Sequence, residues 1–312
     1  MKRGIRKAVI DCGTNTFHLL IVGLTSSNTF EVLHKEKCAV KIGTGIENNT
    51  ITKEAENRAI KTLLGFATTI NQYQVEVTLA TATSAFRSAS NSKAVVQNIF
   101  ESTGIQIKII EGKTEAQLIY NGVSKAVNIS DKNSVIMDIG GGSVEFIICN
   151  NNGVQWLQSF EIGGIRLFQN YHKEDPITIE NIERLTTYLD KQLKPLSKAI
   201  KQFDVKKLIG ASGSFDTLSE IYALENNLNY SQDDELSFNL PVTDTITIIN
   251  DLIKKQRKER MAIKGMIEMR ADLIVVAAIL VKFVLQRYQL TQITTTSYAL
   301  KEGLIFHPLL QE

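Results

Sequence analysis

Short apolar runs rich in β-branched residues alternate along the chain with longer segments of helical periodicity. The apolar runs cover residues 8–10, 75–79, 105–110 and 135–139. Between the first two runs, residues 52–72 place Ile60, Leu63 and Ile70 on one helix face, and Thr52 is expected as the N-cap. Further helices are expected over residues 114–126, 179–200, 215–224 and 269–286. This alternation predicts an α/β fold.

An internal repeat is the most informative feature of the sequence. Residues 8–22 contain an apolar run that ends at Asp11, a short polar turn and a second apolar run. Residues 135–148 repeat this arrangement with Asp138 and a turn of three glycines. Two such strand–turn–strand hairpins predict two homologous domains that face each other with a ligand between them. The domain boundary is expected in the polar stretch of residues 127–132.

Both hairpin turns suit phosphate binding. In a tight turn of small residues, successive backbone N–H groups converge on one point and form a site for an anion. Hydroxyl groups of Thr14, Thr16 and Ser143 can add donors. The candidate phosphate-binding residues of the two turns are Gly13, Thr14, Asn15, Thr16, Gly140, Gly141, Gly142 and Ser143.

The aspartates beside the turns are candidate metal ligands. Mg²⁺ prefers oxygen ligands and usually keeps several waters, so Asp11 and Asp138 would share one ion. A single hairpin of this kind is equally explained as an ordinary tight turn capped by an aspartate. Because hairpin closure requires neither the same aspartate nor the same glycine offset, the repetition favours a functional role.

A third loop follows the apolar residues 208–209. Its candidate residues are Gly210, Ser212, Gly213 and Ser214, and a helix is expected directly after them. Such a loop presents a helix N-terminus to an anion, or allows a base and ribose to approach closely. The same residue types are also ordinary connectors between a strand and a helix.

Length and charge limit the classes of partner. The chain has 312 residues, which favours two domains over one. A net charge of +2 is too small for bulk attraction to a nucleic acid polymer or a membrane surface, so we expect neither as a partner. Residues 254–264 hold six basic side chains that could guide a polyanion, but Glu259 among them favours a solvated helix face.

Cysteine usage and hydropathy predict a cytoplasmic protein without a membrane span. Cys12, Cys38 and Cys149 are odd in number and unclustered, which argues against a disulfide framework and a zinc site. The apolar start is interrupted by Asp11, so no signal peptide is expected. Residues 273–285 are fewer than the roughly 20 needed to span a bilayer and predict a buried helix.

The chain resembles the exopolyphosphatase and guanosine pentaphosphate phosphohydrolase family in these and other residues. This family lies within the superfamily of actin, hexokinase and the heat-shock chaperone ATPases. The segments that carry the resemblance, in family order, are residues 10–16, 80–91, 111–116, 138–145, 163–167, 210–214 and 270–272. Several segments in order are far more specific than one glycine motif.

The resemblance implies two ribonuclease-H-like domains that face an interdomain cleft. The first domain would comprise residues 1–127 and the second residues 128–297. A C-terminal helix over residues 298–312 would pack back on the first domain. The chain is similar to the short, two-domain form of the family, and a homodimer is left open.

The resemblance also implies two catalytic residues. Glu115 matches the family's catalytic glutamate, which orients or deprotonates the attacking water. Thr114 stands where the family often has a second acidic residue, so Glu115 is the candidate in this motif. Arg87 matches a phosphate-binding arginine, since a guanidinium can engage phosphate oxygens bidentately. The alternatives are a carboxylate at a helix N-terminus for Glu115 and a surface arginine for Arg87.

Two further residues are assigned by the resemblance in the second half of the chain. Arg270 matches an arginine that the family brings to the cleft, and Glu145 matches a residue near the metal. Alternatively, Arg270 pairs on its own helix with Asp272 or Glu268, and Glu145 is an outward strand residue.

The implied activity is removal of terminal phosphate from inorganic polyphosphate, with Mg²⁺ or another divalent cation. Guanosine pentaphosphate is the alternative substrate. An ATP-dependent kinase or ATPase is the alternative from another class, because the superfamily shares these hairpins. A non-catalytic phosphate or alarmone sensor is a further alternative.

Overall fold

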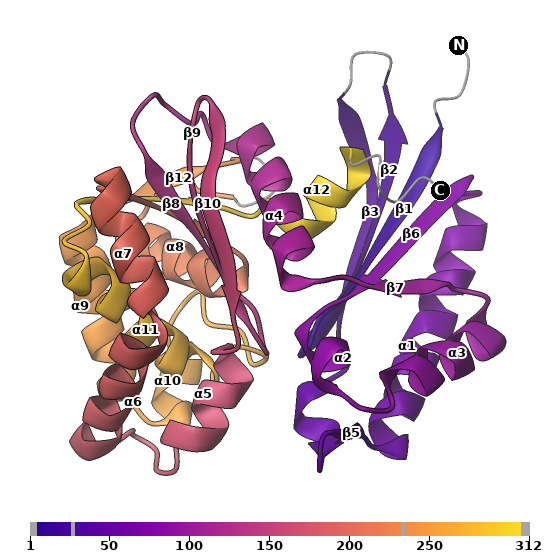
Figure 1. The fold of residues 1–312 in the computed structure, drawn as a ribbon, viewed down its shortest axis with the longest axis horizontal. Helices are drawn as coiled ribbons and strands as arrows, with labels where there is room; N and C mark the ends of the chain where they lie inside the picture. Colours follow the sequence, from indigo (N-terminus) through magenta and orange to yellow (C-terminus); the bar gives the residue numbers. More distant parts are fainter. Residues whose placement is uncertain (1–4, 26–28, 232–234, 307–312) are drawn as a thin grey trace. The chain divides into compact units, whose positions relative to one another are not determined.

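The computed structural model describes residues 5–25, 29–231 and 235–306. These residues form two compact units, and each has its own sheet and core (Figure 1). Unit 1 lies within Met1–Leu118 and Leu300–Glu312, and unit 2 is Ile119–Ala299. The division falls within helix α4 (Gly112–Ala126).

Unit 1 is built on a five-stranded sheet with the order β3-β2-β1-β6-β7. Its strands are β1 (Arg6–Cys12), β2 (Thr16–Leu24), β3 (Phe30–Ala39), β6 (Val77–Ala82) and β7 (Ile107–Ile109). The first three strands pair antiparallel, whereas β6 runs parallel to β1 and β7. A short segment after β3 holds η1 (Gly43–Gly45), β4 (Ile46–Glu47) and β5 (Thr50–Ile51).

The helices of unit 1 are α1 (Lys53–Gln72), α2 (Ser84–Ser88), α3 (Ser92–Thr103) and α12 (Leu300–Phe306), with the start of α4. The side chain of Thr52 accepts a hydrogen bond from the Ala55 N–H, which confirms the predicted N-cap. Helix α1 buries Leu63 and Phe66 in the core and packs against α3. Helix α12 packs against β1, where the buried Lys7 donates from Nζ to the Ile305 carbonyl at 2.8 Å. The rest of the expected C-terminal helix, residues 307–312, lies outside the described residues.

Unit 2 is built on a six-stranded sheet with the order β10-β9-β8-β11-β13-β12. The strands are β8 (Ser134–Ile139), β9 (Val144–Asn150), β10 (Gly153–Phe160), β11 (Lys207–Ala211), β12 (Phe238–Leu240) and β13 (Gln292–Thr296). The helices are α5 (Gly164–Tyr171), α6 (Ile179–Gln192), α7 (Lys194–Phe203), α8 (Gly213–Glu225), α9 (Val242–Lys254), α10 (Arg257–Met261) and α11 (Ile274–Arg287).

The two sheets repeat one topology. In each unit three antiparallel strands are followed by two parallel ones, in the orders β3-β2-β1-β6-β7 and β10-β9-β8-β11-β13. This is the ribonuclease-H-like arrangement. The predicted α/β fold class, with one such domain in each half of the chain, is confirmed.

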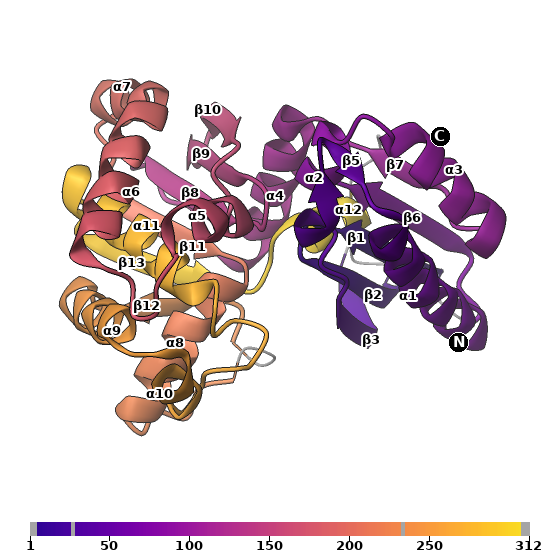
Figure 2. The ribbon, with the colours of Figure 1, turned by 90° about the horizontal axis from the view of Figure 1, so that it is seen from below.

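Helix boundaries differ from expectation at two places. The helix expected over residues 179–200 is broken into α6 and α7, because Pro195 lies in the first turn of α7 and cannot continue a helix. The helix expected over residues 269–286 begins only at Ile274, and a series of turns precedes it. From there α11 is buried on nearly all sides, as expected for residues 273–285, and lies among α5, α6, α8 and α9 (Figure 2).

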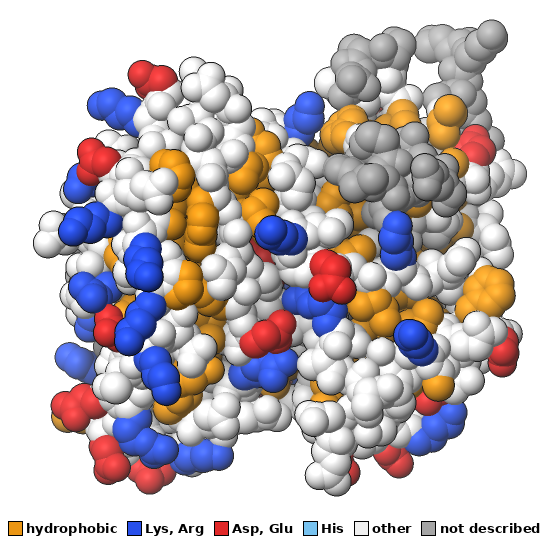
Figure 3. Space-filling view, viewed as in Figure 1, with side chains coloured by type: hydrophobic (Ala, Val, Ile, Leu, Met, Phe, Trp, Pro, Cys, Tyr) orange, Lys and Arg blue, Asp and Glu red, His pale blue; other side chains and the backbone are white. Residues whose placement is uncertain are grey.

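Positive charge is spread over several helices of unit 2. The face in Figure 3 shows Lys and Arg side chains gathered over α6 and α7, where Lys191, Lys194 and Lys198 are exposed. Lys194 and Lys198, four residues apart on α7, lie on a solvated helix face. Among the described residues, none of the helices has the length and hydropathy needed to cross a bilayer.

Candidate active site

The turn between β1 and β2 closes unit 1's hairpin. The Gly13 N–H donates to the Thr16 carbonyl at 3.0 Å, and a Cβ at Gly13 would lie 2.8 Å from that oxygen. The carbonyls of Thr14 and Asn15 accept from the N–H groups of Gly43 and Lys41. The N–H groups of Thr14 and Asn15 make no hydrogen bond within the described part of the chain. Residues 41 and 43 therefore hold this turn through its carbonyl groups.

Unit 2 repeats this geometry between β8 and β9. The Gly140 N–H donates to the Ser143 carbonyl at 3.0 Å, and a Cβ at Gly140 would lie 3.0 Å from that oxygen. The predicted equivalence of the two turns therefore extends to their hydrogen bonding. The N–H groups of Gly141 and Gly142 have no hydrogen-bond acceptor among residues 5–25, 29–231 and 235–306.

The start of α5 supports the second turn from behind. The N–H groups of Gly163, Gly164 and Ile165 donate to the carbonyls of residues 142, 140 and 141, at 3.0, 2.9 and 2.8 Å. Arg166 adds a bond from Nε to the Gly142 carbonyl at 3.0 Å. A Cβ at Gly163 would lie 2.4 Å from the Gly142 carbonyl carbon, so only glycine fits. Residues 163–167 carry part of the family resemblance, but their sequence alone does not indicate this supporting role.

The carboxylates next to the turns occupy matched positions. Asp11 lies opposite His18 in the β1–β2 pair, and Asp138 lies opposite Glu145 in the β8–β9 pair. Asp138 is 7% exposed and Glu145 1% exposed, so Glu145 is not an outward strand residue. Ser159 donates from Oγ to Glu145 Oε1 at 2.6 Å.

The donor types fit a Mg²⁺ site in which water and substrate complete the coordination. In the described part of the chain, no three His, Cys, Asp or Glu residues form a group that could hold a metal. Mg²⁺ is commonly bound by one or two carboxylates together with waters and phosphate oxygens. The adjacent carboxylates Asp138 and Glu145 meet this requirement.

Unit 1 brings the two predicted catalytic side chains into direct contact. Arg87 on α2 and Glu115 on α4 form an ion pair, with 2.5 Å between Nη1 and Oε2. The same Nη1 donates to the Ile110 carbonyl at 3.1 Å. The side chains of Arg87 and Glu115 are only 12% and 9% exposed, so Arg87 is not a surface arginine.

The first turn is connected to the helix that carries Arg87. The Ala85 N–H donates to Thr14 Oγ1 at 3.2 Å, two residues before Arg87. Helix α2 directly follows β6, which lies beside β1 in the sheet. Asp11 lies near the carboxyl end of β1, and Arg87 lies shortly after the carboxyl end of β6. In α/β folds, ligand sites lie at this end of the parallel strands.

In unit 2, Arg270 lies against the third predicted loop, residues 210–214. The Arg270 guanidinium packs against Gly213, where an added Cβ would lie 1.7 Å from Nη2. Burial lowers the pKa of Arg270, and Asp216 and Asp138 oppose this shift. Arg270 Nε is buried and has no hydrogen-bond partner among the described residues. Ser212 donates from Oγ to the Ile139 carbonyl at 3.2 Å, so this loop also contacts the end of β8.

The alternative for Arg270, pairing with Asp272 or Glu268, is wrong. Both carboxylates pair with Arg257 instead.

The crystal structure of an exopolyphosphatase from Cytophaga hutchinsonii matches with 42% identity and a TM-score of 0.93, over 98% of each chain. The family member from Aquifex aeolicus, at 22% identity, a TM-score of 0.81 and 98% of each chain, supports the fold alone.

Curated relatives include two guanosine-5'-triphosphate,3'-diphosphate pyrophosphatases. One, from Photobacterium profundum, is 27% identical over 96% of this chain, and one from Aliivibrio fischeri is 31% identical over 69%. The matches span only 58% and 43% of these relatives' lengths. The model of the Ppx/GppA phosphatase family matches residues 21–312, and the chain therefore belongs to this family.

Proposed function

We propose that this protein hydrolyses the terminal phosphoanhydride bond of inorganic polyphosphate. The observation that carries the proposal is the contact between Glu115 and Arg87, two largely buried side chains of opposite charge. Membership of a phosphatase family and the similarity to an exopolyphosphatase at 42% identity support it.

In this proposal Glu115 orients the attacking water and accepts its proton. Arg87 stabilises the charge that develops on the transferred phosphoryl oxygens. The ion pair at 2.5 Å fixes the position of the carboxylate relative to the guanidinium. The bond from Arg87 to the Ile110 carbonyl holds the guanidinium next to the start of α4.

Each unit supplies its own donors for phosphate. Backbone N–H groups of Thr14 and Asn15 in unit 1, and of Gly141 and Gly142 in unit 2, supply directed donors for phosphate oxygens. Arg270 adds a cation next to the loop of residues 210–214.

A divalent cation, Mg²⁺ in our proposal, would be held by Asp138 and Glu145 of unit 2. When bound, such an ion neutralises phosphate charge and polarises the phosphoryl group. The carboxylates' own role is to place negative charge next to the phosphate-binding turns, where a cation can bind.

Guanosine pentaphosphate is the second candidate substrate, and the names of the curated relatives favour it. A side-by-side assay separates the two: orthophosphate release from long-chain polyphosphate and from guanosine pentaphosphate, with Mg²⁺ titrated from zero. We expect higher kcat/KM for polyphosphate and dependence on the cation. A higher value for guanosine pentaphosphate would replace the first substrate by the second, and no release from either would refute the proposed activity.

A further inference from the structure

Arg260 belongs to the basic run of residues 254–264, which was predicted to be a solvated helix face. It is 1% exposed and is the largest fully buried side chain among the described residues, so that expectation is wrong for this residue. A buried guanidinium is tolerated only when its charge and N–H groups are paired. Arg260 Nε donates to the Ala271 carbonyl at 2.8 Å, and Nη1 contacts Asp175 Oδ1 at 2.7 Å and the Lys255 carbonyl.

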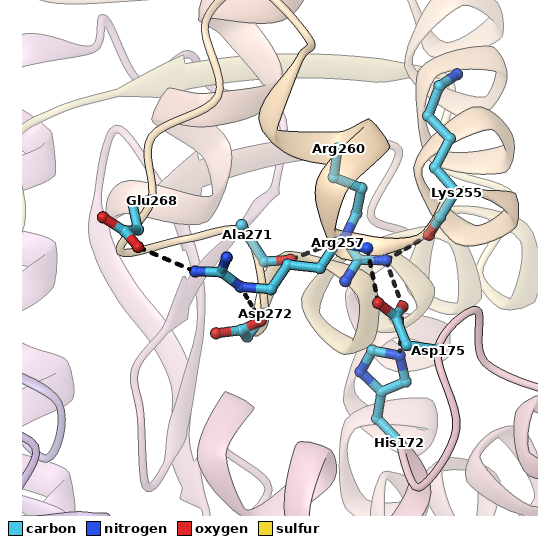
Figure 4. A network of polar contacts seen from close by, with 8 residues as sticks. All are labelled: His172, Asp175, Lys255, Arg257, Arg260, Glu268, Ala271 and Asp272. Atoms are coloured by element: carbon cyan, nitrogen blue, oxygen red, sulfur yellow. Dashed lines mark hydrogen bonds and ion pairs between the residues drawn. The ribbon is translucent and has the colours of Figure 1, made fainter.

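Side chains of α10 contact residues on both sides of Arg270 in the sequence. The segment between α10 and α11 is a series of turns, so it lacks the repeated hydrogen bonds that would fix a helix or strand. Arg260 holds the carbonyl of Ala271, the residue after Arg270. Arg257 bridges the two sides, with Nη2 at 3.2 Å from Glu268 and Nε at 3.0 Å from Asp272 (Figure 4). Side chains of α10 therefore set the path of the backbone that carries Arg270.

Asp175 connects this network to α5. Its Oδ2 accepts from the Arg257 N–H at 2.6 Å, and its Oδ1 faces both Arg260 and His172 Nε2, the latter at 3.4 Å. Burial raises the pKa of Asp175, but the hydrogen bonds from Arg260 and Arg257 outweigh it and lower the pKa overall. His172 ends α5, whose first residues hold the carbonyls of the turn at 140–142.

A continuous set of contacts thus runs from the turn at 140–142, through α5, to the segment around Arg270. We propose that Arg260 and Asp175 are positioning residues, which hold the Arg270 guanidinium at the distance from this turn that a phosphate chain requires. The inference rests on the phosphate-binding role proposed above for Arg270. It predicts that Arg260 and Asp175 act through Arg270 without contacting substrate.

Two conservative variants of the full chain test this role. In Arg260→Lys a single ammonium replaces a guanidinium that donates to three acceptors. In Asp175→Asn the charge is removed while the size is kept. Because misplacement by about 1 Å can cost roughly 10²-fold, we expect kcat/KM for polyphosphate to fall by about tenfold or more. Affinity for inorganic tripolyphosphate, measured by titration calorimetry, should fall with it. Arg287→Lys is the matched control, since Arg287 on α11 forms an exposed pair with Asp190.

The same substitutions in an Arg270→Ala background distinguish positioning from a structural role. If Arg260 acts through Arg270, then Arg260→Lys changes tripolyphosphate affinity by less than twofold once Arg270 is absent. An equal loss in both backgrounds would overturn the inference. Arg257→Gln, at an exposed site, should weaken binding in the same direction even if the buried variants do not fold, and unchanged affinity there would also count against it. Because binding is read without turnover, an enzyme that fails to hydrolyse polyphosphate would refute the proposed function alone.

Discussion

Replacing Gly213 with alanine should displace Arg270 while leaving the fold in place. The new Cβ would lie 1.7 Å from Arg270 Nη2 and 2.4 Å from Cζ, whereas non-bonded heavy atoms sit about 3.5–4.0 Å apart. The guanidinium must therefore move by roughly 2 Å. Because it is the end of a flexible side chain, it can move without the backbone. A lost hydrogen bond to a charged group costs about 1.5–3 kcal/mol, which corresponds to roughly ten- to a hundredfold in kcat/KM.

The assay is steady-state phosphate release from polyphosphate, together with urea unfolding of each variant. The control is Gly65→Ala on α1, where the added Cβ meets nothing within 4 Å and no loss of activity is expected. Arg270→Ala and the double variant complete a thermodynamic cycle, in which Gly213→Ala should add almost nothing once Arg270 is absent. Wild-type activity in Gly213→Ala, or a full additional loss in the double variant, would refute the assignment of Arg270 to the site.

Three further predictions concern stability. Ser212 has φ +73° and ψ 173°, a region almost confined to glycine, so Ser212→Gly should be more stable than Ser212→Ala by about 1 kcal/mol in urea unfolding; the reverse order would contradict strain at this loop. Gly163→Ala forces a Cβ to within 2.4 Å of the Gly142 backbone and should lower the free energy of unfolding by at least about 1 kcal/mol, in contrast to Gly65→Ala. Burial lowers the pKa of His172 below 6.5, with Asp175 opposing and Arg260 reinforcing the shift, so the unfolded chain binds a proton first as the pH falls. Stability is therefore complete above pH 6.5 and declines below it, and His172→Gln should flatten that decline in urea midpoints measured from pH 7.5 to 5.5; an unchanged slope would exclude His172 as its source.

The fold was predictable because it depends on patterns that repeat along the chain. Apolar runs ending at Asp11 and Asp138 recur with the same turn chemistry, and the structure gives both turns the same hydrogen bond at 3.0 Å. Thr52 was recognisable as an N-cap because capping is a local interaction. Strand β13, whose sequence is Gln-Ile-Thr-Thr-Thr, was not among the expected strands, since its threonines are buried in the sheet despite being polar.

The contacts that assemble the candidate site were not predictable from one sequence. Arg87 and Glu115 were named separately by family resemblance, but nothing in their spacing of 28 residues indicates a direct ion pair. Arg260 was misjudged because a buried and a solvated arginine look alike in a basic run. The start of α11 was placed too early because residues 269–273 have helical composition, whereas the network around Arg270 holds them in turns. In both errors tertiary contacts override local propensity.

The most direct test of the central claim is the turnover of Glu115→Gln with long-chain polyphosphate and Mg²⁺. The amide keeps the size of the side chain but cannot accept a proton from water, so kcat should fall by about 10²–10⁴-fold. Tripolyphosphate affinity should stay close to that of the wild type. Glu101→Gln, an exposed glutamate of α3, is the control and should retain full activity. Undiminished kcat in pure Glu115→Gln would contradict the assignment of Glu115 as the base and, with it, the proposed mechanism.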